Sequence, residues 1–100
     1  MIRHIVLFTA KRAEDLEIIL AALGRLREIP HADRLEVVRN ARLDRHSNEI
    51  DVIVYGEFAD AEALARYKAH PIYRKTIGTV RPLRNLRIAV DYQVPEPSGR

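Results

Sequence analysis

The sequence contains no cysteine, so no disulfide framework, thiolate nucleophile or thiolate metal ligand is available. Long apolar runs are also missing, since no stretch approaches the roughly 18 apolar residues of a membrane-spanning helix. The apolar run that opens the chain, residues 1–8, is too short for the core and cleavage site of a signal peptide. These absences favour a soluble cytoplasmic domain with no membrane partner.

Several patterns that carry chemistry are lacking as well. The four glycines form no phosphate-binding loop, and neither Ser47 nor Ser98, the only serines, stands in a Gly-x-Ser-x-Gly elbow. None of the four histidines has a second histidine three or four residues away, as many metal sites do. We therefore expect no metal, no cofactor and no hydrolysis by a nucleophilic side chain.

What remains is the composition of a small folded domain. The chain has 100 residues, 47% of them apolar and 31% charged, which suits a single domain. The formal net charge is +3, but most of the cations stand among acids. Binding of nucleic acid needs basic side chains gathered on one face, and an RNA-binding sheet needs several exposed aromatics where this chain offers Tyr55 alone. We expect no nucleic-acid partner.

Hydrophobic periodicity predicts the secondary structure. Strands are expected where apolar residues alternate or run together, at residues 2–9, 34–43, 50–58 and 86–92. Helices are expected where apolar residues recur at three- and four-residue spacing, at 13–29 and 61–70. Asp60 is the expected cap of the second helix. Pro71 forces His70 out of the helical region, so that helix ends there and a short helix follows over 72–80.

The order strand, helix, strand, strand, helix, strand predicts an α+β, ferredoxin-like fold. This β-α-β-β-α-β arrangement forms a four-stranded antiparallel sheet with helices on one face. The other face is expected to carry the apolar side chains of Ile5, Leu7, Ile53, Tyr55 and Ala89. Because an exposed apolar face marks an association surface, we predict a homodimer in which two copies pack sheet to sheet.

Four short stretches stand in an order that resembles a known family. They are the opening His4-Ile5-Val6-Leu7-Phe8, the strand end Glu57-Phe58, the corner Tyr67-x-x-His70-Pro71 and the closing Val90-Asp91-Tyr92. Across residues 1–92 the chain resembles the stress-responsive dimeric α/β-barrel (Dabb) family, with residues 93–100 as a C-terminal tail. The resemblance implies two ferredoxin-like units that pair into a dimeric α/β barrel. The resemblance does not assign a reaction to this chain, because most members of the family have no assigned reaction.

One branch of the family, the plant olivetolic acid cyclases, implies a set of site residues. These enzymes close a polyketide chain in a pocket between the helices and the sheet, where a histidine and a tyrosine transfer protons. The resemblance places Tyr67 at the tyrosine position and His4 at the opening of the first strand. Tyr73 and Val52 stand where the family has histidines. The expected ligand-binding residues are Val6, Phe8, Val54 and His70.

Tyr73 stands in place of a histidine, and this substitution weakens the capacity of the site for proton transfer. Histidine titrates near pH 6.5 and can take and return a proton at neutral pH, whereas tyrosine titrates near pH 10 and is a poor base. His4 could supply the base if its ring points into the pocket. Structural roles stay open for all of these side chains, because a tyrosine on an apolar helix face usually buries its ring and finds one partner for its hydroxyl.

Two functions are compatible with these residues. We expect a homodimeric Dabb-type protein of unassigned biochemical role, which serves in a stress response or binds a small hydrophobic or aromatic ligand. The alternative is a cofactor-independent cyclase, isomerase or monooxygenase-like enzyme that uses His4, Tyr67 and Tyr73 as catalytic proton-transfer groups. The enzyme requires these three side chains to meet at an enclosed pocket of roughly several hundred Å³. A filled core at that place argues against it.

Overall fold

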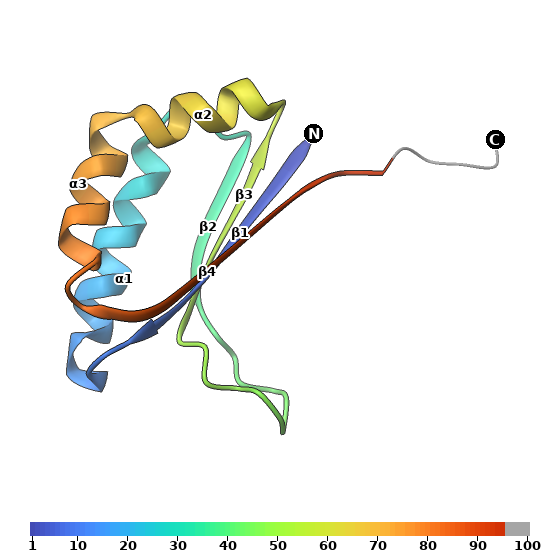
Figure 1. Cartoon of the computed structure of the whole chain (residues 1–100). Helices are drawn as coiled ribbons and strands as arrows, with labels where there is room; N and C mark the ends of the chain where they lie inside the picture. Colours follow the sequence, from blue (N-terminus) through green and yellow to red (C-terminus); the bar gives the residue numbers. More distant parts are fainter. Residues whose placement is uncertain (96–100) are drawn as a thin grey trace.

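The computed structural model describes residues 1–95, and the last part of the predicted tail, residues 96–100, lies outside the described residues. Four strands form one layer: β1 (Ile2–Ala10), β2 (Arg34–Arg39), β3 (Val52–Phe58) and β4 (Arg84–Gln93). Their order in the sheet is β2-β3-β1-β4, and every neighbouring pair is antiparallel. A layer of helices covers one face of this sheet (Figure 1). The predicted ferredoxin-like α+β fold is confirmed.

The helix layer is built from three α-helices and two short 3₁₀ turns within residues 1–95. They are η1 (Ala13–Asp15), α1 (Leu16–Gly24), η2 (Arg25–Glu28), α2 (Ala61–Ala69) and α3 (Pro71–Val80). The single helix expected over 13–29 is therefore α-helical in its middle, while its two ends tighten into 3₁₀ turns. No helix in the described part of the chain is both long and apolar enough to cross a membrane.

The corner between α2 and α3 follows the expected local chemistry. The Asp60 carboxylate accepts a hydrogen bond from the Ala63 N–H at 2.8 Å and so caps α2. Pro71 occupies the first turn of α3, where its missing N–H costs nothing. His70, the residue before it, is extended at φ −66° and ψ 142°, as a residue before proline must be. The break between the two helices is thus encoded in two adjacent residues.

The second strand is shorter than its apolar pattern predicted. It ends at Arg39, although residues up to 43 were expected to continue it. The Asn40 side chain donates to the Ile50 carbonyl, and Arg42 adopts the left-handed conformation at φ 54°. Because a left-handed residue cannot continue a strand, the chain leaves the sheet as the long hairpin loop between β2 and β3 (Figure 1).

The open face of the sheet, opposite the helices, is largely apolar. Ile5, Leu7, Ile53 and Tyr55 lie on it as predicted, but Ala89 does not. Ala89 pairs with Val6, whose side chain is buried under the helices, so Ala89 lies on the helix side. The apolar side chains that β4 adds to the open face are Leu86, Ile88, Val90 and Tyr92, all of them exposed.

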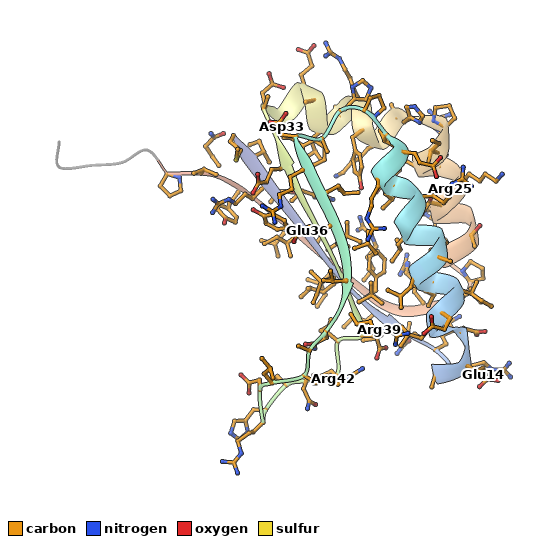
Figure 2. All side chains as sticks on the ribbon, turned by 180° about the vertical axis from the view of Figure 1, so that it is seen from behind. Glu14, Arg25, Asp33, Glu36, Arg39 and Arg42 are labelled. Carbon is orange, nitrogen blue, oxygen red and sulfur yellow. The ribbon has the colours of Figure 1, made fainter. Side chains whose placement is uncertain are left out.

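One end of the open face is polar. Arg3 donates to the Tyr92 hydroxyl, the Tyr55 hydroxyl donates to Glu57, and Arg34 pairs with Glu36. Figure 2 shows Glu36 on the side of β2 that faces away from the helices. The open face therefore combines an apolar area with a cluster of both charge signs.

Candidate functional site

Two polar side chains lie within the apolar core between the sheet and the helices. His4 comes from β1 and Tyr67 from α2, and each is 1% exposed. Their ring centroids are 6.2 Å apart in an edge-on arrangement, and the Phe58 ring packs against both. Alternation along β1 puts His4 on the same side as Val6 and Phe8, which is why a histidine enters this core.

The sheet register supplies His4 with a partner. Antiparallel pairing of β1 with β4 sets His4 directly opposite Asp91, and the His4 Nδ1 lies 2.5 Å from an Asp91 carboxylate oxygen. Because an ionised carboxylate only accepts hydrogen bonds, Nδ1 carries the proton and Nε2 of the neutral ring keeps its lone pair. Asp91 therefore orients the imidazole and leaves its second nitrogen free to act as an acceptor or base.

Burial decides the charge of this histidine. Removal from water lowers the pKa of His4, while the hydrogen bond and the negative charge of Asp91 oppose that change. The net direction is downward, since the ring is enclosed whereas the Asp91 side chain, at 42% exposure, remains in contact with solvent. At neutral pH His4 is thus the uncharged form that can accept a proton.

The Tyr67 hydroxyl is a buried donor with no partner. Within residues 1–95 no hydrogen bond reaches it, although the oxygen is fully enclosed. Burial raises the pKa of Tyr67 well above that of an ordinary phenol, and the neighbouring Tyr73 adds to the rise. The hydroxyl therefore stays protonated at every physiological pH and can donate a hydrogen bond to an oxygen placed beside it.

A small cavity lies where these groups meet, with a volume of about 10 Å³. That is close to the space that one water molecule needs. Its polar lining residues are His4, Tyr67, Tyr73 and Arg87, and its apolar ones are Val6, Phe8, Leu23, Leu26, Val54 and Ile77. The lining has the mixture of polar and apolar groups that is typical of a ligand site. In this conformation, however, the cavity is too small to hold a ligand larger than water.

Most of the residues named from the sequence converge on this cavity. His4, Tyr67 and Tyr73 all line it, and so do Val6, Phe8 and Val54. The Tyr73 ring stands edge-on to Tyr67 with 5.2 Å between centroids. The pocket of several hundred Å³ that an enzyme would need around the three proton-transfer groups is not open in this structure.

His70, which was expected among the ligand-binding residues, does not line this cavity. Its extended backbone directs the ring back over the start of α3, where Nδ1 accepts a hydrogen bond from the Ile72 N–H at 3.1 Å. The His70 ring stands edge-on to that of His31, with 6.4 Å between centroids. His70 is thus the N-cap of α3 rather than part of the cavity.

Two residues at this site, Asp91 and Arg87, were not predicted from the sequence. Both lie on β4 with Ala89 between them, so alternation puts all three on the helix side of the strand. That alternation is visible in the sequence. The register of β4 against β1 is not, and it is the register that sets Asp91 opposite His4 and Arg87 opposite Phe8.

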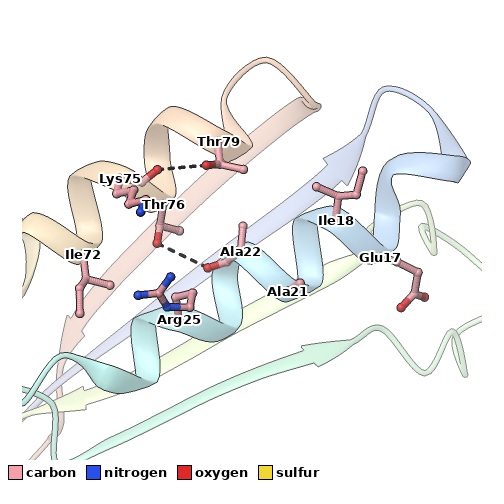
Figure 3. A pocket seen from close by; sticks show the side chains of 9 residues that line it. All are labelled: Glu17, Ile18, Ala21, Ala22, Arg25, Ile72, Lys75, Thr76 and Thr79. Carbon is pink, nitrogen blue, oxygen red and sulfur yellow. Dashed lines mark hydrogen bonds between the residues drawn. The ribbon is translucent and has the colours of Figure 1, made fainter.

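A second, larger hollow lies between α1 and α3, on the outside of the helix layer (Figure 3). It is an open groove of about 510 Å³. Ala21, Ala22 and Thr76 line its middle, and the Thr76 hydroxyl donates to the Ala22 carbonyl. Glu17 and Arg25 lie at its rim, and each forms an ion pair with a residue outside the groove. The smaller cavity is the better candidate site, because titratable groups with shifted pKa values meet there.

The described residues offer no obvious metal site. In residues 1–95 no three side chains of histidine, aspartate or glutamate gather closely enough to hold a metal ion. The donors at the cavity are one imidazole and two phenols, with Asp91 already bound to the imidazole. The chemistry that this arrangement supports is hydrogen bonding and proton transfer.

The topology and the enclosed His4–Asp91–Tyr67 cluster define a ferredoxin-like α+β domain with a polar site between its two layers. Residues 2–94 match the stress responsive A/B barrel domain, Dabb, and the chain belongs to that family. No curated protein matches the sequence.

Solved structures share the fold over almost the whole chain. A Dabb family protein from Mesorhizobium loti is 28% identical with a TM-score of 0.78, and the match covers 96% of this chain and 97% of that one. A dimeric ferredoxin-like protein of unknown function from Thermobifida fusca is 24% identical, with a TM-score of 0.79 and coverage of 93% and 90%. A hydroxynitrile lyase from Passiflora edulis is 17% identical, with a TM-score of 0.77 and coverage of 98% and 96%. The last two likenesses show the fold alone.

Proposed function

We propose that this protein is a homodimeric ligand-binding domain, and that its cavity takes a small apolar molecule with an oxygen that accepts a hydrogen bond from Tyr67. The observation that carries the proposal is the buried Tyr67 hydroxyl, which has no partner within residues 1–95. Such a group costs about 1–3 kcal/mol of stability, and a ligand oxygen beside it would remove that cost. A role in a stress response belongs to the same proposal, because the family carries that description.

The open face of the sheet supports the dimer. Ile88 and Val90 of β4 and Val38 of β2 are each exposed there by more than two fifths, so apolar side chains reach solvent at both edges of the sheet. The Thermobifida fusca protein with the same fold is described as dimeric. Two copies that pack open face to open face would bury these side chains and leave the cavity, on the other side of the sheet, accessible.

A ligand larger than water must widen the cavity. Tyr73 and Ile77 of α3 are lining residues that are only partly buried, so they have room to turn outward. On the opposite side Ala89 and Asp91 of β4 are exposed although they face the helix side, so the helix layer leaves this edge of the sheet uncovered. We expect a ligand to enter the cavity between α3 and β4.

A thermal-shift screen tests the proposal with aromatic and polyketide-like acids and their neutral analogues. We expect at least one compound to raise the melting temperature, and to bind about fivefold or more weakly to Tyr67→Phe, which corresponds to one lost hydrogen bond of about 1 kcal/mol. Tyr55→Phe, on the other face of the sheet, is the matched control and should bind as the wild type does. Equal affinity of the wild type and Tyr67→Phe would contradict the proposal.

A second candidate function is proton transfer, favoured by the His4–Asp91 hydrogen bond of 2.5 Å. A neutral histidine oriented by a carboxylate is an arrangement suited to a general base. In this function Asp91 is a positioning residue, and Tyr67 donates to the oxygen that gains charge when a C–H proton beside a carbonyl is removed.

Deuterium exchange tests the second candidate. Acetylacetone in D₂O would be followed by NMR, with the rate in buffer subtracted. The candidate predicts exchange above the buffer rate that is lost in His4→Gln and about tenfold slower in Asp91→Asn. His46→Gln, in the exposed loop, should exchange at the wild-type rate. A wild-type rate equal to that of buffer would leave ligand binding as the function.

A further inference from the structure

Arg87 places a positive charge beside the cavity. It lies on β4 opposite Phe8, which puts it on the helix side of the sheet, and its side chain lines the cavity together with His4 and Tyr67. It is partly buried. Its charge is felt by both polar groups, since it contributes to lowering the pKa of His4 and opposes the rise in the pKa of Tyr67.

Arg87 has no counter-ion in the described part of the chain, and neither has Arg84, the other partly buried arginine of β4. Five other arginines of the described chain form ion pairs with carboxylates: Arg25, Arg34, Arg39, Arg42 and Arg66. Within residues 1–95 Arg87 forms neither an ion pair nor a side-chain hydrogen bond. The nearest acid on its own side of β4, Asp91, lies four residues along the strand, about 13 Å at the usual rise, and is bound to His4.

A partly buried guanidinium without a counter-ion favours a ligand that brings one. The planar fork of arginine matches a carboxylate in a bidentate arrangement, and such charge-assisted pairs are about twice as strong as neutral hydrogen bonds. The charges of Lys68 and Arg87 both act on His4, but of the two only Arg87 lines the cavity. One cation at the cavity itself suits one negative charge better than the two of a phosphate. The rest of the lining is apolar or aromatic.

We propose that the ligand of this site is a small carboxylic acid, whose carboxylate binds Arg87 while its apolar body enters the cavity beside Tyr67. The inference rests on the proposed ligand-binding function and adds the chemical class of the ligand. Arg87 is then the residue that selects anionic over neutral molecules of the same shape.

The test compares phenylacetate with phenylacetamide, which have nearly the same shape but differ in charge. NMR titrations of the protein give both dissociation constants. We expect phenylacetate to bind at least tenfold more tightly than phenylacetamide. Arg87→Gln should reduce that ratio to about one and Arg87→Lys should leave an intermediate ratio, because lysine keeps the charge without the bidentate geometry. Arg81→Gln, exposed and outside the cavity, should keep the full ratio.

A second variant covers the case in which Arg87→Gln does not fold. Ala89 is exposed and lies two residues from Arg87 on the same side of β4. Ala89→Glu should place a competing carboxylate next to Arg87 and weaken phenylacetate more than phenylacetamide.

The outcomes separate the two proposals. Equal binding of the two compounds to the wild type would overturn the role of Arg87 and leave the ligand site standing. A preference for phenylacetate that survives in both Arg87→Gln and Ala89→Glu would overturn it as well. If neither compound bound at millimolar concentration and no compound of the thermal-shift screen bound either, the ligand-binding function itself would fail and this inference with it.

Discussion

The side chains of His4 and Tyr67 are polar, but they lie in the hydrophobic core between the sheet and the helices. Val6, Phe8 and Phe58 surround them, and an apolar residue of similar shape at either position would avoid the cost of burying a polar atom. His4 offsets part of that cost through Asp91, but Tyr67 has no such partner in residues 1–95. The two residues therefore make different predictions for stability.

The stability of the protein should decrease as the pH falls below about 6.5. Burial lowers the pKa of His4 in the folded state below its unfolded value of about 6.5, so in this range the unfolded chain binds more protons than the folded one. The free energy of unfolding is then fully retained above that pH and falls below it. Urea denaturation at fixed protein concentration, from slightly alkaline to moderately acidic pH in steps of about one unit, measures the slope.

Two variants identify His4 as the source of that slope. His4→Gln should flatten it, whereas His46→Gln in the exposed loop should leave it in place. In Asp91→Asn the opposing effect of the carboxylate is removed, so NMR titration of the ring should find the pKa of His4 lower still. A higher pKa in Asp91→Asn would contradict the raising effect assigned to Asp91.

Tyr67→Phe should be stabilising, by up to about 3 kcal/mol, because it removes an unpaired buried hydroxyl and keeps the ring. Tyr55→Phe is the matched comparison. The Tyr55 hydroxyl donates to Glu57, so its loss should lower the free energy of unfolding. Chemical denaturation measures the free energy of unfolding of both variants. A decrease of more than about 1 kcal/mol in Tyr67→Phe would mean that the Tyr67 hydroxyl has a hydrogen-bond partner.

At the scale of elements, β3 holds a close packing contact at Gly56. Gly56 lies between His4 of β1 and Leu35 of β2, and the absence of a side chain leaves room for the Phe58 ring two residues on. That ring in turn packs against Tyr67, with 4.9 Å between centroids. The glycine therefore helps to set the position of the site's aromatic side chains.

Two glycine substitutions should have opposite effects. A Cβ at Gly56 would lie 2.7 Å from the Phe58 ring and 3.1 Å from a Leu35 methyl group, and because Phe58 is fully buried it cannot move away. Gly56→Ala should therefore cost about 1–3 kcal/mol. Gly78→Ala meets no atom within 4 Å in α3 and should stabilise by up to about 1 kcal/mol, since alanine is the better helix former. Urea midpoints check both, and a stabilising Gly56→Ala would contradict the packing.

At the scale of the whole molecule, the two faces of the sheet differ in what they carry. The helix side holds the core and the candidate site, while the open side holds an apolar area and the polar cluster around Arg3 and Glu57. A homodimer formed through the open face would leave one site per copy, each reached from the gap between α3 and β4. Binding and assembly should therefore be separable by mutation.

Ile88→Lys should convert the dimer to a monomer. Ile88 is 43% exposed on the open face, and a lysine there would bury a charge in the interface. Ile18→Lys is the control, because Ile18 is 51% exposed but lies on α1, in the groove of Figure 3. Size-exclusion chromatography with light scattering should give about twice 11.5 kDa for the wild type and the control, and 11.5 kDa for Ile88→Lys. A monomeric wild type at micromolar concentration would refute the interface.

The features that depend on neighbouring residues were predictable from the sequence by itself. Element order, the Asp60 cap, the Pro71 corner and the apolar character of both sheet faces follow from periodicity and local backbone chemistry, and each is present. The grouping of His4, Tyr67 and Tyr73 came from the resemblance to the Dabb family and not from local pattern.

Features that depend on pairing between distant residues were decided by the tertiary structure. The His4–Asp91 bond joins residues 87 positions apart, and Arg87 and Ala89 owe their side of the sheet to the register of β4 against β1. Because a slip of one residue moves every side chain of a strand to the other face, no local pattern could settle these placements. The volume of the cavity likewise depends on how side chains from both layers pack, and only the folded chain determines that.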